Sequence, residues 1–192
     1  MQEQKSKGRQ AKLILVVGEN GTGKTTLITQ LVNAELKAGR KALVVTPHFT
    51  EWTTFNNVPI MECSDIYNFK GIERIHFDGD MSIFDTIKKE FFNGMLVFDD
   101  GRAYMKSTLD QNIKALLISR RQIMTDIVMA FHNIVDVPPQ IFYYAPEIIL
   151  KKTSTSFESR KKLILPDYYE KLEKAQERVN KNSNKYAYEL IR

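Results

Sequence analysis

The stretch LILVVGENGTGKTTLITQLV, residues 13–32, decides the fold of this 192-residue chain. Its first five residues are leucines and β-branched residues in a continuous run, which is typical of a buried strand. The next eight, GENGTGKT at 18–25, match the pattern G-x-x-x-x-G-K-[ST] of a phosphate-binding loop. Apolar residues then recur at helical spacing from Leu27 to Leu36, and Gly39 follows where a glycine ends a helix. The stretch therefore predicts a strand, a phosphate-binding loop and a helix in direct succession.

Each part of this loop has a chemical reason. The glycines allow the backbone to approach a phosphate, and the helix that follows points its positive end at the anion. Lys24 is expected to bridge the β- and γ-phosphates, and the Thr25 hydroxyl is expected to ligate Mg²⁺. We therefore predict ATP and Mg²⁺ as cofactors. The residues expected to bind the nucleotide are Gly18, Glu19, Asn20, Gly21, Thr22, Gly23, Lys24, Thr25 and Thr26.

A pair of acidic residues supplies the second element that hydrolysis needs. The apolar run MLVF at 95–98 is followed directly by Asp99 and Asp100. At the carboxyl end of a central strand, Asp99 is predicted to join Thr25 as a magnesium ligand. Asp100 is predicted to polarise the attacking water, so it is a candidate catalytic residue together with Lys24.

The rest of the chain alternates between strand-like and helix-like segments. Together with the phosphate-binding loop, this predicts a three-layer α/β P-loop NTPase fold with a mainly parallel sheet. Further strands are expected at 41–45, 71–77, 95–98, 127–131 and 148–151, and helices at 24–37, 83–92, 109–123, 138–144 and 166–180. Residues 46–68 have no clear period and are expected to form an irregular excursion. In it, Trp52 is expected to pack a subdomain, and His48, like His76, to be structural. Residues 1–192 are expected to form a single ATPase domain.

Composition excludes several classes of protein. Hydrophobic residues make up 43% and charged residues 27% of the chain, as in a folded soluble protein. No apolar run approaches the roughly 20 residues of a membrane span, and the first residues lack the apolar segment of a secretory signal, so we expect a cytoplasmic location. Cys63 is the one cysteine, which excludes intramolecular disulfides and cysteine-rich zinc sites.

The positive charge is concentrated at one end. The net charge is +5, and residues 1–150 hold 17 basic and 17 acidic residues, whereas the basic segment at 151–192 holds 11 basic and 6 acidic ones. This asymmetry favours an anionic partner such as double-stranded DNA, bound through phosphates without regard to sequence. The side chains expected to make these contacts are Lys151, Lys152, Arg160, Lys161 and Lys162. A solvated terminal helix is the alternative.

Taken together, the motifs resemble the FtsK–HerA superfamily of DNA-pumping ATPases, and most closely its small viral genome-packaging members. The resemblance covers about residues 12–152. In the family's pattern, an Arg-His pair precedes the fourth core strand, and Arg120-Arg121 occupies its place here. His132 occupies the place of a glutamine that senses the γ-phosphate, and Val137-Pro138 matches a Val-Pro step. It implies the RecA-like type of this fold and ATP hydrolysis that drives DNA translocation or genome packaging.

The resemblance also implies partners and further site residues. It implies a homo-oligomeric ring, with viral portal or capsid proteins as partners and a location in the host cytoplasm or the virion. Either Arg120 or Arg121 is then a candidate arginine finger, a cation that acts on a neighbouring subunit's nucleotide, and Arg102 is a further candidate. His132 is a candidate catalytic residue, although a histidine in place of the glutamine departs from the family's pattern.

Two other functions fit the same phosphate-binding loop. One is a small-molecule or nucleotide kinase, with residues 151–162 as a lid. The other is a nucleotide-gated assembly protein with little turnover. The paired acids favour a hydrolase over a kinase, because a kinase suppresses the activation of water. A GTPase is disfavoured because the chain has no Asn-Lys-x-Asp motif.

Overall fold

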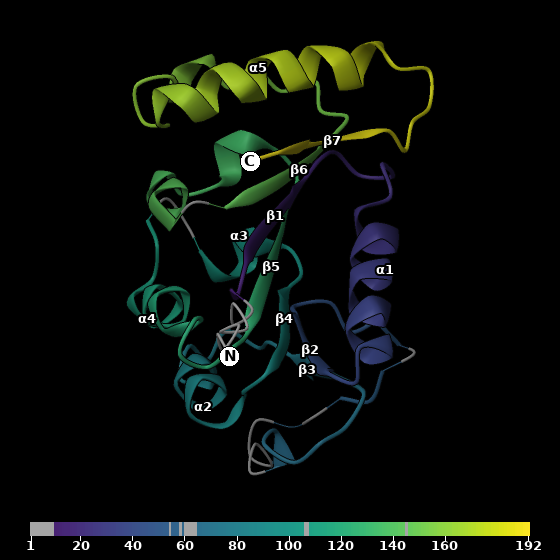
Figure 1. The fold of residues 1–192 in the computed structure, drawn as a ribbon, viewed down its shortest axis with the longest axis vertical. Coiled ribbons are helices and arrows are strands. Elements are labelled where there is room, and N and C mark those ends of the chain that lie inside the picture. The colour runs from purple at the N-terminus through teal and green to yellow at the C-terminus, as the bar shows by residue number, and fades with distance from the viewer. Residues whose placement is uncertain (1–9, 54, 58, 60–64, 106–107, 145) are drawn as a thin grey trace, which may run out of the picture.

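The structure is a computed structural model that describes residues 10–53, 55–57, 59, 65–105, 108–144 and 146–192. These residues form a seven-stranded sheet in the order β3-β2-β4-β5-β1-β6-β7 (Figure 1). The strands are β1 (Leu13–Val17), β2 (Lys41–Thr46), β3 (Ile72–His76), β4 (Gly94–Phe98), β5 (Asp126–Phe131), β6 (Glu147–Lys151) and β7 (Tyr188–Ile191).

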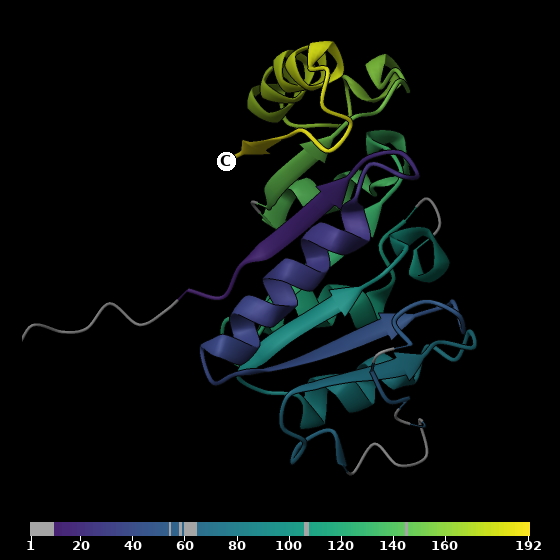
Figure 2. The same cartoon turned by 90° about the vertical axis from the view of Figure 1, so that its right-hand side faces the viewer.

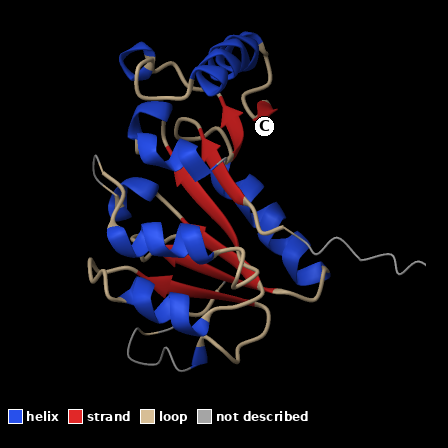
Figure 3. Cartoon of the chain, turned by 60° about the vertical axis from the view of Figure 1, so that its left-hand side comes forward, coloured by secondary structure: helices blue, strands red, loops and turns tan. Residues whose placement is uncertain are grey.

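All neighbouring strands from β3 to β6 are parallel, and β7 alone among the described strands runs antiparallel, along β6. Figure 3 shows the parallel strands as arrows that point the same way. The central strands β1, β4 and β5 are buried along their whole length, as their continuous apolar runs predict. The predicted α/β class and mainly parallel sheet are confirmed.

Helices cover both faces of this sheet. Helix α1 (Lys24–Lys37) lies across one face and buries Ile28 and Val32 against residues of the central strands (Figure 2). The opposite face carries the larger apolar core. Its helices are α2 (Ile83–Glu90), the single turn α3 (Gly101–Tyr104), α4 (Gln111–Ser119) and α5 (Pro166–Lys181). None of the helices that the structure describes is both long and apolar enough to cross a membrane.

The structure differs from the predicted elements mainly near the carboxyl terminus and in short helices. Strand β7 was not predicted, because four residues at a sheet edge carry little periodic signal: Tyr188 and Leu190 are exposed and Ile191 is buried. The helix expected at 138–144 is the 3₁₀ helix η3 (Pro139–Tyr144). Two more 3₁₀ helices, η2 (Ile134–Asp136) and η4 (Glu158–Arg160), lie in the connections on either side of β6.

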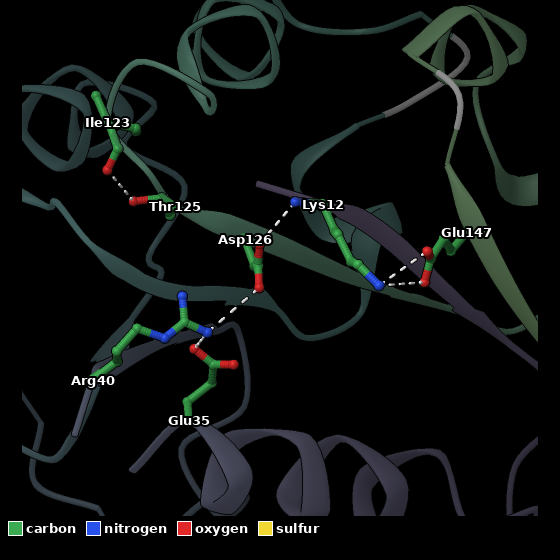
Figure 4. A network of polar contacts seen from close by, with 7 residues as sticks. All are labelled: Lys12, Glu35, Arg40, Ile123, Thr125, Asp126 and Glu147. Carbon is green, nitrogen blue, oxygen red and sulfur yellow. Dashed lines mark hydrogen bonds and ion pairs between the residues drawn. The ribbon is translucent and has the colours of Figure 1, made fainter. Parts of the chain in front are cut away.

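A network of charged residues joins the elements at the amino ends of the parallel strands (Figure 4). The Asp126 carboxylate accepts a hydrogen bond of 2.7 Å from the backbone N–H of Lys12 and lies 3.6 Å from the Arg40 guanidinium. Arg40 also pairs with Glu35 of α1, and the Lys12 amine lies 3.1 Å from Glu147 at the start of β6. These contacts hold α1, β1, β5 and β6 together at the edge of the sheet where the strands begin.

Candidate functional site

The phosphate-binding loop lies at the opposite edge, where the parallel strands end. The first residue of the loop is bonded to a neighbouring strand: the Gly18 N–H donates to the Phe131 carbonyl at the end of β5 (3.1 Å). The acidic residues after β4 are bonded in the same way, since the Asp99 N–H donates to the Val45 carbonyl of β2 (3.0 Å). Figure 2 shows β1 leading through this loop into α1. The strand order therefore brings the residues after β1, β2, β4 and β5 to one place.

The loop has the conformation that an anion-binding turn requires. Gly23 has a φ of 81°, in the left-handed region that glycine adopts at low cost, and α1 begins at the next residue. The Lys24 amine bends back over the loop, donating to the carbonyls of Gly18 (2.6 Å) and Glu19 (3.1 Å), and lies 3.4 Å from the Nδ1 atom of His132. Burial lowers the pKa of Lys24, although the nearby Asp99 and Asp100 carboxylates oppose this effect.

A cavity of about 400 Å³ opens between this loop and the acidic residues. Six of the nine predicted nucleotide-binding residues line it: Asn20, Gly21, Gly23, Lys24, Thr25 and Thr26. From the other strands it is lined by His48, Glu51, Asp99, Asp100, Ala130, Phe131 and His132. The structure thus brings together Lys24, Thr25, Asp99, Asp100 and His132, which the sequence predicted as one site.

The three other predicted nucleotide-binding residues, Gly18, Glu19 and Thr22, are not among the residues that line this cavity. A Cβ atom on Gly18 would lie 2.6 Å from the Cβ atom of Lys151, so this glycine allows β1 and β6 to pack closely. The Thr22 hydroxyl donates to the Glu19 carbonyl (2.7 Å). The Glu19 carboxylate accepts hydrogen bonds from the N–H (2.5 Å) and the hydroxyl (2.6 Å) of Ser154, which lower its pKa. Glu19 therefore ties the loop to the segment after β6.

Asp99 is a buried carboxylate, only 6% exposed. Its pKa is raised to about 6: burial is the main cause, the neighbouring Glu51 carboxyl adds to the rise, and a hydrogen bond of 2.7 Å from the Trp52 indole N–H opposes it. Trp52 also stacks on Phe55, with ring centroids 5.8 Å apart, so it packs as predicted and in addition holds Asp99.

Asp100 has a left-handed backbone, with a φ of 52°, at the start of α3. Its Oδ2 atom lies 3.6 Å from the Nε2 atom of His48, and its Oδ1 atom is buried without a hydrogen-bond partner. The interpretation of His48 as a structural residue stays a prediction; in the structure His48 lines the cavity beside a candidate catalytic carboxylate.

Sequence reasoning missed Glu51 as well as His48. Both follow β2, in the stretch that showed no period. A signal for both residues exists in the sequence. Polar residues that follow one strand of a parallel sheet lie at the same edge as the acids that follow the neighbouring strand. Using it requires knowing that β2 pairs with β4, and this pairing appears only in the structure.

The structure places Arg120 and Arg121 away from this cavity. Both lie between α4 and the start of β5, at the edge of the sheet opposite the phosphate-binding loop. The Arg120 guanidinium is buried and donates to the carbonyls of Leu117 and Tyr144 (2.5 and 3.1 Å). The expectation that Arg120 acts as an arginine finger is corrected, because the side chain is buried and two of its donors bind carbonyls of its own subunit. Arg121 is exposed, and its role as a finger stays a prediction.

The structure also corrects the set of basic residues expected to contact DNA. Lys151 is buried, with its amine donating to the Tyr186 carbonyl (3.0 Å), so it does not face solvent. The Arg160 guanidinium also donates a hydrogen bond within the protein, to the Val135 carbonyl (2.6 Å). Lys161 and Lys162 are exposed and keep the role that the charge asymmetry predicts.

A second cavity, of about 380 Å³, continues from the phosphate-binding loop on the side away from the acids. It shares Gly23 and Thr26 with the first cavity, and its wall includes Leu27 of α1 and the rings of Tyr186 and Tyr188. An apolar, aromatic wall beside a phosphate site suits the base of a nucleotide.

The residues present fit a magnesium ion that arrives with phosphates. Within the described ranges, no group of three or more histidine, cysteine or acidic side chains is arranged to hold a metal by itself. Mg²⁺ in nucleotide sites usually takes one or two protein oxygens and completes its shell with phosphates and water. Asp99 and Thr25 supply such oxygens in one cavity, and the unpartnered Oδ1 of Asp100 is a buried acceptor there.

Comparison with solved structures finds the same architecture in viral proteins. The genome-packaging NTPase B204 from Sulfolobus turreted icosahedral virus 2, in complex with ATPγS, superposes with a TM-score of 0.72 over 95% of this chain and 97% of that chain, at 16% sequence identity. The chain therefore shares the fold of B204. The DNA-packaging ATPase B204 from Sulfolobus turreted icosahedral virus gives a TM-score of 0.71 over 95% and 98% of the two chains, also at 16% identity.

The likeness to a conjugation coupling protein is weaker. The pCW3 conjugation coupling protein TcpA, with ATPγS, gives a TM-score of 0.50 at 19% identity and matches 82% of this chain and 52% of that chain. No protein-family model matches the chain, and a search of curated proteins finds no match. The resemblance predicted from the sequence is thus confirmed at the level of the fold.

Proposed function

We propose that this protein is a Mg²⁺-dependent ATPase that drives DNA translocation, and specifically the packaging of a viral genome, as a homo-oligomeric motor in the host cytoplasm or the virion. The observation that carries the proposal is the single cavity in which Lys24, Thr25, Asp99 and Asp100 meet. The likeness to B204 supports it, since B204 is described as a genome-packaging NTPase and was crystallised with ATP analogues.

Each residue has a role in this proposal. Lys24 leaves the Gly18 and Glu19 carbonyls and binds the β- and γ-phosphates, while the N–H groups of the loop surround them. Asp99 and Thr25 hold Mg²⁺, which supplies charge neutralisation at the phosphates when bound. Asp100 accepts a hydrogen bond from the attacking water, and His132, 3.4 Å from the Lys24 amine, hydrogen-bonds the γ-phosphate. The second cavity takes the base.

The DNA partner is proposed from the exposed charge of the basic segment and from the likeness to packaging ATPases. Lys161 and Lys162 contact DNA phosphates, which makes binding independent of sequence and sensitive to salt. The ring and the viral portal or capsid partners are proposed on the same likeness.

The test is phosphate release from ATP, with and without double-stranded DNA, for the wild-type protein and Lys24→Ala, combined with particle size by light scattering. We expect DNA-stimulated, Mg²⁺-dependent release from a multimer, and neither nucleotide binding nor turnover from Lys24→Ala. The variant should keep its melting temperature, since the hydrogen bonds that the structure gives the Lys24 amine go to loop carbonyls and to His132 and not to the core. Phosphate transfer to a small molecule would indicate a kinase, and nucleotide binding without turnover would indicate an assembly protein.

A further inference from the structure

A further cavity, of about 610 Å³, lies at the edge of the sheet where the parallel strands begin. Leu36 near the end of α1, Lys41 at the start of β2, Phe69 in the turn before β3 and Phe92 before β4 line it. Strand β2 is six residues long, and a strand rises about 3.3 Å per residue, so this cavity lies on the order of 20 Å from the phosphate-binding loop. A molecule bound in it does not touch the nucleotide.

Lys41 places a cation in this cavity without a described carboxylate to neutralise it. Its amine donates to the carbonyls of Ile66 (2.9 Å) and Tyr67 (2.7 Å). The amine also lies 5.0 Å from the ring centroid of Phe69 and 5.1 Å from that of Phe91, and burial lowers the pKa of Lys41. An ammonium group has three donors, so one donor remains after the two carbonyls. An incoming carboxylate stabilises such an ammonium.

The charged side chains of the cavity wall have one sign. Of the described residues that line it, Arg40, Lys41 and Lys70 are basic and none is acidic. Arg40 is paired with Glu35 and lies 3.6 Å from Asp126, so its charge is already neutralised. Lys70 is exposed and forms no hydrogen bond or ion pair with another described residue. Two cations, Lys41 and Lys70, are therefore left for an anionic ligand.

Apolar side chains continue this surface beyond the cavity. Tyr67 is 59% exposed and packs edge-on against Phe92, with ring centroids 6.3 Å apart, and Leu36 is 46% exposed. The backbone beside Phe92 is fixed, because the Asn93 N–H donates to the Ile123 carbonyl (2.9 Å). Exposed aromatic side chains on a preformed surface are typical anchors of protein recognition sites.

These features fit an acidic peptide better than a nucleic acid. A nucleic-acid backbone is bound by a row of cations that contact successive phosphates, whereas this surface offers two. The cavity volume lies within the range of about 300–1,000 Å³ that encloses a small ligand, which is enough for a few side chains. A free small molecule of that size would leave the exposed Leu36 and Tyr67 beside the cavity uncovered, and a longer peptide covers them.

We propose that this cavity is a docking site for a segment of a partner protein in which aspartate or glutamate stands next to an aromatic or aliphatic side chain. The apolar side chain packs between Leu36, Tyr67 and Phe92. The carboxylates of the segment pair with Lys41 and Lys70. This docking site is independent of the proposed ATPase function.

The probe is the synthetic peptide acetyl-Asp-Phe-Asp-Leu-Asp-amide, and the control peptide has asparagine in place of each aspartate. Each is titrated into the isotope-labelled protein, and the chemical shifts of the backbone amides are measured. We expect the acidic peptide to shift the amides of Leu36, Tyr67 and Asn93 and to bind more weakly as NaCl is added. It should bind about fivefold more tightly than the asparagine peptide, as expected for two partly exposed ion pairs.

Two variants test the cavity residues. Tyr67→Ala should weaken binding of the acidic peptide by about fivefold or more, as truncation of an interface anchor does, and Lys70→Gln by about threefold. Tyr143→Ala and Lys174→Gln replace exposed residues of η3 and α5, so they are the matched controls and should bind as wild type does. All four should keep the melting temperature and phosphate release of the wild-type protein. If Tyr67→Ala fails to fold, Lys70→Gln and the asparagine peptide still decide.

Several outcomes overturn the inference: no shift on adding the acidic peptide, shifts confined to residues outside the cavity, equal affinity for the two peptides, or unchanged affinity in both Tyr67→Ala and Lys70→Gln. A single-stranded oligonucleotide that displaces the peptide would assign the surface to nucleic acid instead. A smaller particle size of Tyr67→Ala in light scattering would assign it to a second copy of this chain. A wild-type protein without phosphate release would overturn the proposed function and leave the docking site unaffected.

Discussion

Asp99→Asn should make the protein without nucleotide more stable, although it removes a proposed magnesium ligand. The folded protein raises the pKa of Asp99 from 3.8 to about 6, chiefly by burial. One pKa unit corresponds to about 1.4 kcal/mol, so the ionised carboxylate costs the folded state on the order of 3 kcal/mol at neutral pH. Asparagine removes this cost, and its amide oxygen still accepts the hydrogen bond from Trp52.

The magnitude can be measured by thermal unfolding. An unfolding entropy of about 2.1 cal/mol/K per residue gives about 0.4 kcal/mol/K for 192 residues, so the melting temperature should rise by about 7 °C. Because the folded pKa lies above the unfolded one, the cost is absent below pH 3.8, where both states hold the proton, and complete above about pH 6. The gain from Asp99→Asn should therefore shrink as the pH falls through this window.

Two controls accompany this measurement. Asp65→Asn, at an exposed carboxylate, should change stability by less than about 0.5 kcal/mol at either pH. Mg-ATPγS should raise the melting temperature of the wild-type protein more than that of Asp99→Asn. The reasoning is refuted if Asp99→Asn is no more stable than wild type at neutral pH, or if its gain is the same at acidic pH.

The remaining predictions concern the basic residues. Arg120→Ala should destabilise the protein by about 2–3 kcal/mol in chemical denaturation, because two carbonyls lose their charged donor, whereas Arg121→Ala should stay within about 0.5 kcal/mol. If Arg121 is the finger, mixing Arg121→Ala with Lys24→Ala protein should restore part of the ATPase activity; no recovery in mixtures that co-assemble would contradict this. Replacing Lys161 and Lys162 by glutamine should reduce the log–log salt slope of duplex DNA binding by about 1.8, and an unchanged slope would place the DNA contacts elsewhere.

The sequence alone determined the fold class and the phosphate-binding half of the site. A phosphate-binding loop is local: eight consecutive residues between a buried strand and a helix specify its torsion angles and its donors. The acids after β4 were recognised for the same reason, since a buried apolar run followed by Asp99 and Asp100 is also a local pattern. In the structure, Lys24, Thr25 and both acids line one cavity.

The tertiary structure alone decided what surrounds these residues. Glu51 and His48 lie near Asp99 and Asp100 because β2 pairs with β4. The Arg120 side chain is buried because its guanidinium donates to a carbonyl at the end of η3. Lys151 is buried because the chain returns as β7 beside β6. Periodicity and motif spacing indicate the conformation of one segment. The order of the strands, and whether a charged side chain is exposed or buried, depend on pairing and packing between distant segments, which no local pattern encodes.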